Sequence, residues 1–273
     1  MLREYRRQLE RLKLLRDYKA IVTLSEHMAA EFIKHGIPLD CIYTLASPLS
    51  NGSLQKAYEI PEVGPSTTMS GKCAVQNNSR MDYQSTPPWR LLFLGRMDFL
   101  KGGCLFLSAL PHVASSLDRP LRVIFAGDGP DRSAWESQAA RSKDQSRGLE
   151  IKFVGWLEGD KREAVLADSD LLVMPSQWPE PFGLSGLEAG QCGVPAVAFA
   201  VGGIPQWLED GVNGTLAPGN PPTAAGLSDA IVRALRDPDT HAHLRQGALE
   251  RATKHTLQQH LAQLFPVLER YAR

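Results

Sequence analysis

Residues 171–189 read LLVMPSQWPEPFGLSGLEA, and this stretch decides the fold. The apolar run Leu171–Met174 predicts a buried strand that stops at Pro175. A helix can begin only near Leu184, after the last of the prolines. The backbone N–H groups of Gly183, Leu184 and Ser185 would then point out of the helix start, and such unsatisfied donors at the positive end of a helix dipole bind anions.

Two glutamates flank this predicted anion site. Glu180 lies in the loop between strand and helix, and Glu188 lies about one turn inside the helix. The loop therefore offers amide donors for phosphate groups and, on either side of them, carboxylate acceptors for hydroxyl groups. A sugar nucleotide requires that combination of groups.

Apolar runs and helical segments alternate on both sides of this stretch. The predicted strands span 91–94, 121–126, 151–153, 171–174 and 196–199, with helices near 103–116, 130–142, 160–167, 184–192 and 203–209. Strands buried on both faces and separated by helices predict an α/β fold with a doubly wound, Rossmann-like parallel sheet. Further helices are predicted over 221–236, 240–252 and 257–271, the last interrupted by Pro266.

Basic residues follow the first strand of this sheet. Gly95 lets the backbone approach a ligand, while Arg96 and Lys101 place two cations at the same strand end as the Glu180 loop. Two cations and the amides of a helix start suit a diphosphate. Taken alone, a glycine followed by two basic residues is also common in surface turns that bind nothing.

Two further strand ends carry candidate residues. Asp128, in Gly127-Asp128-Gly129-Pro130, is as well placed to cap the next helix as to contact a ligand. Trp156, after the following strand, is placed either to flank a nucleobase or to pack on the helix below.

Asp168-Ser169-Asp170 resembles the Asp-x-Asp pair with which many glycosyltransferases hold a divalent metal ion. Here the pair precedes the strand at 171–174, at the amino end of the sheet and away from the other motifs. We therefore interpret it as a helix-to-strand turn, and we expect no metal and no cofactor.

Composition narrows the function classes. The chain has 273 residues with 30 basic and 30 acidic side chains, and this zero net charge argues against a general nucleic-acid binder. Its four scattered cysteines predict neither a zinc site nor a disulfide framework and favour a reducing, cytoplasmic location. No run is long enough to span a bilayer. Residues 1–17 predict a basic amphipathic helix that packs on a neighbouring domain or, alternatively, contacts the inner membrane face.

The motifs, taken in their order, make the chain similar to the family 4 retaining glycosyltransferases, which have the GT-B fold. The resemblance covers roughly residues 90–271. Its matching elements are Gly95-Arg96 with Lys101-Gly102, Gly127-Asp128-Gly129-Pro130, Phe153-Val154-Gly155, Glu180 and Glu188 with seven residues between them, Gly193-Val194-Pro195, and Gly202-Gly203.

The resemblance implies a role for individual residues. In the family the first glutamate contacts the donor sugar, the second contacts the ribose, and the two basic residues bind the diphosphate. The catalytic residues expected on this basis are Glu180, Arg96 and Lys101. The expected donor-binding residues are Gly95, Asp128, Trp156, Phe182, Gly183, Leu184, Ser185 and Glu188.

The resemblance also implies a domain organisation. A complete family member carries a whole acceptor-binding domain before its donor-binding domain, and only the last portion of the former is expected here. We assign residues 1–50 to a remnant of that domain and the polar stretch 51–88 to a flexible linker or insertion. Residues 89–273 are assigned to the donor-binding domain with a last helix that crosses back.

The expected function is transfer of a hexosyl-type sugar, with retention of configuration, from a UDP-, GDP- or ADP-linked donor. The acceptor is an unidentified glycan, lipid or small molecule. The alternative is a non-catalytic sugar-nucleotide-binding module, or half of a split enzyme that requires an acceptor-domain partner. A dehydrogenase or an epimerase is disfavoured, because no Gly-x-Gly-x-x-Gly motif follows a first strand.

Overall fold

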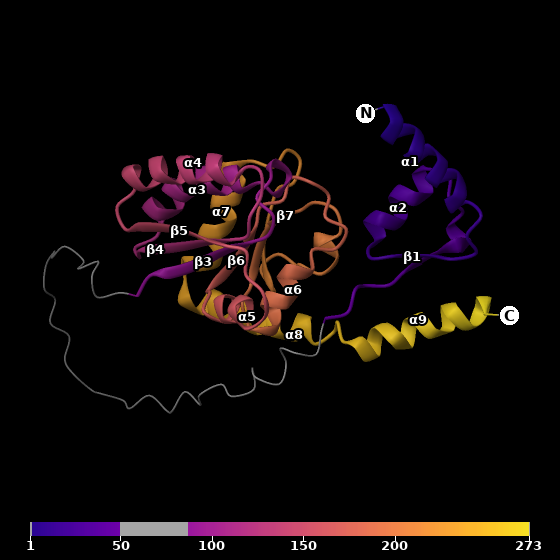
Figure 1. Ribbon diagram of the computed structural model, residues 1–273. Helices are drawn as coiled ribbons and strands as arrows, with labels where there is room; N and C mark the ends of the chain where they lie inside the picture. Colours follow the sequence, from indigo (N-terminus) through magenta and orange to yellow (C-terminus); the bar gives the residue numbers. More distant parts are fainter. Residues whose placement is uncertain (1, 50–86, 273) are drawn as a thin grey trace, which may run out of the picture.

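A computed structural model describes residues 2–49 and 87–272 and is dominated by a six-stranded parallel sheet (Figure 1). The predicted linker at 51–88 lies almost entirely outside the described residues. The strands follow the order β5-β4-β3-β6-β7-β8 across the sheet. They are β3 (Trp89–Leu94), β4 (Leu121–Ala126), β5 (Leu149–Gly155), β6 (Leu171–Met174), β7 (Ala196–Phe199) and β8 (Gly214–Ala217).

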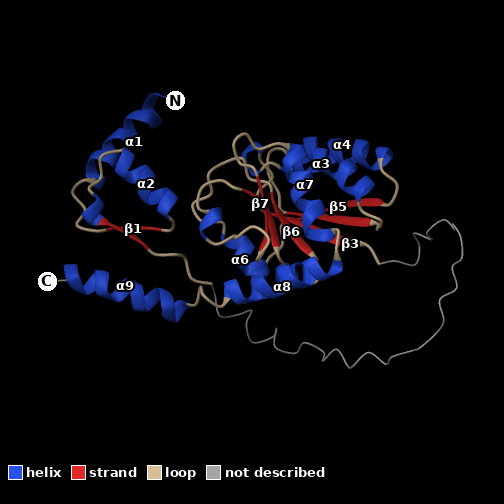
Figure 2. Ribbon diagram, turned by 180° about the vertical axis from the view of Figure 1, so that it is seen from behind, coloured by secondary structure: helices blue, strands red, loops and turns tan. Residues whose placement is uncertain are grey.

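Helices cover both faces of this sheet, so the predicted doubly wound fold is confirmed (Figures 1 and 2). Along β3, Leu91 and Phe93 are buried toward one face and Leu92 toward the other. Side chains that alternate between two buried faces require an apolar strand, which explains the uninterrupted apolar runs. The first face packs on α3 (Gly103–Ser116), α4 (Arg132–Gln145) and α7 (Ala224–Leu235); the second packs mainly on α5 (Gly159–Ala167), α6 (Leu184–Gln191) and α8 (Pro238–Ala252).

The order in which the strands are added reverses between β3 and β6, which pair in parallel. From β3 the chain adds β4 and β5 on one side, then returns to add β6, β7 and β8 on the other. The loops that leave β3 and β6 therefore diverge toward opposite faces, and a crevice opens at their carboxyl ends. The motifs singled out in the sequence follow these strands.

Both β3 and β5 begin two residues earlier than predicted, and three elements differ in existence, type or continuity. The short strand β8 was not predicted, because Gly-Thr-Leu-Ala carries too weak an apolar pattern. The helix predicted near 203–209 is only a 3-10 turn, Ile204–Gln206. The last helix, α9 (Leu257–Tyr271), continues through Pro266, and the carbonyl that the proline leaves without a partner belongs to Ala262 at an exposed position.

A separate two-stranded parallel sheet precedes the large one. It pairs β1 (Ile21–Thr23) with β2 (Ile42–Thr44), next to α1 (Leu2–Leu15) and α2 (Glu26–Lys34). Ser25 caps α2, since its Oγ accepts from the Met28 N–H at 3.2 Å. None of the helices within 2–49 and 87–272 has the length and apolar character that crossing a bilayer requires.

The helix α9 runs from the large sheet to this smaller one, as both views show (Figures 1 and 2). His260 Nδ1 donates to the Ala46 carbonyl at 2.9 Å, and the hydroxyls of Tyr43 and Tyr271 lie 3.1 Å apart. The Leu49 N–H also donates to the His255 carbonyl at 2.8 Å. Two chain segments thus run together between the two sheets.

The Asp168-Ser169-Asp170 segment forms the predicted turn between α5 and β6. Arg90 on β3 binds Asp170 through its backbone N–H at 2.8 Å and its Nη2 at 3.1 Å, and its guanidinium also pairs with Asp168. His241 on α8 is buried there and donates from Nε2 to the Asp170 carbonyl at 2.8 Å. The two carboxylates therefore hold the amino end of the sheet together.

The buried His241 makes stability depend on pH. Burial lowers its pKa, and its hydrogen bond to Asp170 opposes that effect only in part. A histidine with a lowered native pKa stabilises the fold fully above about pH 6.5, its unfolded value, and that contribution is lost as pH falls through the native pKa. We expect His241→Gln to lower the urea midpoint at about pH 7.5 but to reduce the further loss on acidification to about pH 5.5.

His112→Gln is the matched control, because His112 is exposed on α3. This variant should keep the pH dependence of the parent chain. Equal pH dependence in His241→Gln and the parent would show that His241 is not the titrating group.

Candidate functional site

The loops after β3 and β6 lie in contact at the point where the strand order reverses. Gly102, in the left-handed region at φ 70°, lies so close to β6 that a Cβ there would stand 1.8 Å from the Pro175 carbonyl oxygen. The Gln177 N–H donates to the Leu100 carbonyl at 2.8 Å, and Gln177 Nε2 donates to the Phe99 carbonyl at 2.9 Å. Backbone contacts of this kind fix the loops relative to each other.

The contact brings Lys101 and Glu180 together. Lys101 Nζ lies 2.6 Å from Glu180 Oε1, and the buried Ser176 hydroxyl donates to the same oxygen. Glu180 Oε2 has no partner among the residues that the structure describes. The carboxylate, with a side chain only 12% exposed, is thus held by one oxygen and keeps the other for a hydrogen-bond donor such as a sugar hydroxyl.

A second turn holds the backbone of Glu180. The Gly203 N–H donates to the Glu180 carbonyl at 2.7 Å, and a Cβ on Gly202 would stand 2.3 Å from that oxygen. In the same turn, Gln206 Oε1 accepts from the Glu26 N–H at the start of α2 at 2.9 Å. Gly202-Gly203 therefore has a structural role, and the turn also contacts the smaller sheet unit.

The start of α6 has the predicted free amides. Gly183 precedes the helix at φ 86°, and within residues 2–49 and 87–272 nothing accepts from the N–H groups of Leu184 and Ser185. The Phe182 side chain is buried in the core instead of facing the loop, and its carbonyl accepts from Trp207 Nε1 at 2.6 Å. Phe182 therefore positions the helix start, and only its backbone is available to a ligand.

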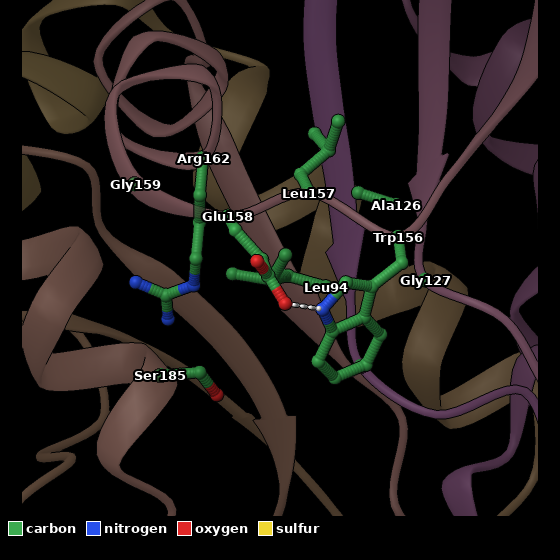
Figure 3. Close-up of a pocket in the computed structure, with 10 residues that line it drawn as sticks. Leu94, Ala126, Gly127, Trp156, Leu157, Glu158, Gly159, Arg162 and Ser185 are labelled. Atoms are coloured by element: carbon green, nitrogen blue, oxygen red, sulfur yellow. Dashed lines mark hydrogen bonds between the residues drawn. The ribbon is translucent and has the colours of Figure 1, made fainter.

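A cavity of ≈ 380 Å³ lies beside this helix start (Figure 3). Trp156 and Glu158 stand on one side of it, and Arg162 and Ser185 on the other. The lining residues are Leu94, Gly95, Ala126, Gly127, Trp156, Leu157, Glu158, Gly159, Arg162 and Ser185. Gly95, Trp156 and Ser185 were expected in the site, whereas Glu158 and Arg162 were not.

Glu188 does not line the cavity itself but forms an ion pair with a residue that does. Arg162 Nη2 on α5 binds Glu188 Oε2 on α6, and the side chains are 29% and 32% exposed. Sequence alone does not show this pairing, because it joins the facing sides of two helices. For Glu158 a signal was present, since it follows Trp156 within the same strand-to-helix loop.

Arg96 and Asp128 lie at the edge of the crevice. Arg96 is 68% exposed, with Nε 3.4 Å from Asp98, so its guanidinium is available to an anion. Asp128 accepts from the Gly129 N–H at 2.7 Å and from Arg132 Nη1 at 3.2 Å. Because α4 begins only at Arg132, Asp128 stabilises the turn before the helix and does not bond a helix amide.

A model of the family described as glycosyl transferases group 1 matches residues 88–237, the part of the chain that forms the crevice. The chain belongs to this family. The matched region carries both glutamates and both basic residues.

Two curated relatives illustrate the similarity. The glycogen synthase of Mycobacterium tuberculosis is 33% identical over 168 residues, which are 62% of this chain and 39% of that protein. The D-inositol 3-phosphate glycosyltransferase of Frankia alni is 36% identical over 172 residues, which are 59% and 40% of the two chains. The chain therefore spans about two fifths of the length of these relatives.

Solved structures show the same fold. HepE of Anabaena, in complex with UDP and glucose, matches 92% of this chain and 63% of its own with a TM-score of 0.70 and 20% identity. Sucrose-phosphate synthase from Thermosynechococcus elongatus matches 97% and 61% with a TM-score of 0.72 and 22% identity. The fold is the Rossmann-like parallel α/β fold of GT-B glycosyltransferases.

The close approach of Gly102 to the Pro175 carbonyl predicts that a larger residue at position 102 lowers stability. Gly102→Ala should destabilise the chain by about 3 kcal/mol or more, since the new methyl group overlaps the Pro175 carbonyl in a left-handed backbone. Gly211→Ala is the control, because Gly211 has φ 77° but open space around it, and it should cost only about 1–2 kcal/mol. Urea unfolding measures both; equal losses would mean that loop contact adds nothing to backbone strain.

Proposed function

We propose that this chain supplies the donor site of a family 4 glycosyltransferase that transfers a sugar from a nucleoside diphosphate to an acceptor. The observation that carries the proposal is the Glu180 carboxylate, fixed at one oxygen by Lys101 and Ser176 and free at the other. It stands in the loop that leads to the open amides of α6. HepE has been solved with UDP-glucose, which supports a nucleotide-sugar ligand for this fold.

The groups suit departure of a diphosphate. As the bond between the sugar and the diphosphate breaks, negative charge develops on the leaving oxygen. The Leu184 and Ser185 amides, the Arg96 guanidinium and the Lys101 ammonium are the donors positioned to stabilise that charge. Glu180 then orients the sugar through a hydroxyl. We propose transfer of a hexosyl sugar with retention of configuration, as the family resemblance implies.

We further propose that residues 89–273 form the donor-binding domain and that residues 1–50 belong to an acceptor-binding domain. Two separate sheets, joined by the segments around Ala46 and His255, support this division. The alternative, a module that binds sugar nucleotides without catalysis, predicts the same binding but no transfer when an acceptor-binding domain is supplied.

Calorimetry on the whole chain tests whether Arg96 and Lys101 bind the diphosphate. Arg96→Ala and Lys101→Ala should each weaken binding of a nucleoside diphosphate by roughly 1.5–3 kcal/mol, the scale of a charge-assisted hydrogen bond, with or without EDTA. Lys152→Ala, which removes an exposed lysine on β5, is the control and should bind like the parent. Equal loss of nucleoside and nucleoside diphosphate binding would instead indicate damage to the fold.

A second experiment isolates the role of Glu180. Glu180→Gln should weaken binding of the nucleoside diphosphate sugar by about tenfold relative to the nucleoside diphosphate, because only the sugar reaches the carboxylate, whereas the loss of the Lys101 ion pair acts on both ligands alike. Glu150→Gln, at an exposed ion pair on β5, should change neither affinity. If Glu180→Gln weakened both ligands alike, Glu180 would not be the sugar-contacting residue.

A further inference from the structure

Glu158 is a carboxylate at the cavity that the proposed donor site does not yet use. It lies in the loop between β5 and α5, directly after Trp156 and Leu157. Trp156 Nε1 donates to Glu158 Oε1 at 2.9 Å, which holds the carboxylate beside the indole ring (Figure 3). Trp156 is 63% exposed and Glu158 is exposed as well, so an aromatic face and a carboxylate are both open to a ligand.

The position of Glu158 is that expected for a residue that contacts the nucleobase. In the proposed donor site Glu180 contacts the sugar, and the start of α6 with Ser185 binds the diphosphate. Ser185 also lines the cavity, across from Trp156 and Glu158. A nucleotide that runs from Glu180 past Ser185 therefore ends with its base in this cavity, where an aromatic face and the apolar side chains of Leu94, Ala126 and Leu157 are available for stacking.

The charges at the cavity restrict which nucleobase can bind there. Two charged side chains line the cavity, Arg162 and Glu158. Arg162 is already paired with Glu188, whereas no cation pairs with Glu158 among the described residues. An ionised carboxylate accepts hydrogen bonds and cannot donate them. The bond from Trp156 occupies only part of its acceptor capacity. A base that fits must therefore present N–H groups to Glu158 and keep carbonyl oxygens away from it.

We propose that Glu158 selects guanine, so that the donor is a GDP-linked sugar; this rests on the proposed function. Guanine presents its ring N1–H and its 2-amino group side by side, and a carboxylate accepts both in a bidentate pair. Uracil presents one N–H between two carbonyl oxygens, which the carboxylate repels. Adenine presents an amino group beside a ring lone pair. Only guanine offers two adjacent donors.

Titration of the whole chain with GDP, IDP and UDP tests the proposal. IDP is GDP without the 2-amino group, so it isolates one of the two hydrogen bonds. The parent chain should bind GDP about tenfold or more tightly than either IDP or UDP. This comparison needs no variant, so it does not depend on the folding of a mutant.

Glu158→Gln should weaken GDP by about tenfold and bring GDP and IDP to similar affinities. Glu163→Gln is the matched control, because Glu163 lies on α5 but does not line the cavity, and it should keep the preference for GDP. Tighter binding of UDP, equal binding of GDP and IDP by the parent, or an unchanged preference in Glu158→Gln would each overturn the assignment of guanine while leaving the donor site in place. Failure of every nucleoside diphosphate to bind would overturn the proposed function itself.

Discussion

The site depends on a contact between two backbone segments, where Gly102 after β3 meets Pro175 after β6. The strands are neighbours in the sheet, but their loops turn toward opposite faces, so they meet only at the switch in strand order. Because the contact is between backbones, it leaves side chains free for other partners. Lys101 and Ser176 stand on either side of it and converge on one oxygen of Glu180.

Much of the fold could be predicted because a strand buried on both faces must be apolar throughout. Thus β4, β6 and β7 have the bounds that their apolar runs predict. The misses have physical causes. In β8 the buried residues are small, so the pattern is weak, and after Gly203 the chain makes only one 3-10 turn. Pro266 does not end α9, since the carbonyl that loses its partner lies at an exposed position.

The site could be predicted only where one loop carries the chemistry. The open amides of α6 follow from the position of Gly183, and they are present. Arg162 could not be found in this way, because it acts on Glu188, which lies on another helix. Ser176 lies in the same loop as Glu180, only four residues before it, but a single serine there gives no signal of its own. Phe182 was expected to bind the donor. The residues that follow it do present free amides at the start of α6. Its own side chain is directed into the core, where it packs against His255.

The short turn at Ile204–Gln206 links two parts of the molecule that the chain otherwise joins at a distance. The Gly203 N–H, just before this turn, donates to the Glu180 carbonyl, and Gln206 accepts from the first amide of α2. One short turn is therefore bonded on one side to the loop that bears the carboxylate and on the other side to the smaller sheet unit. A change in the position of that unit would act on the backbone of Glu180 through this turn.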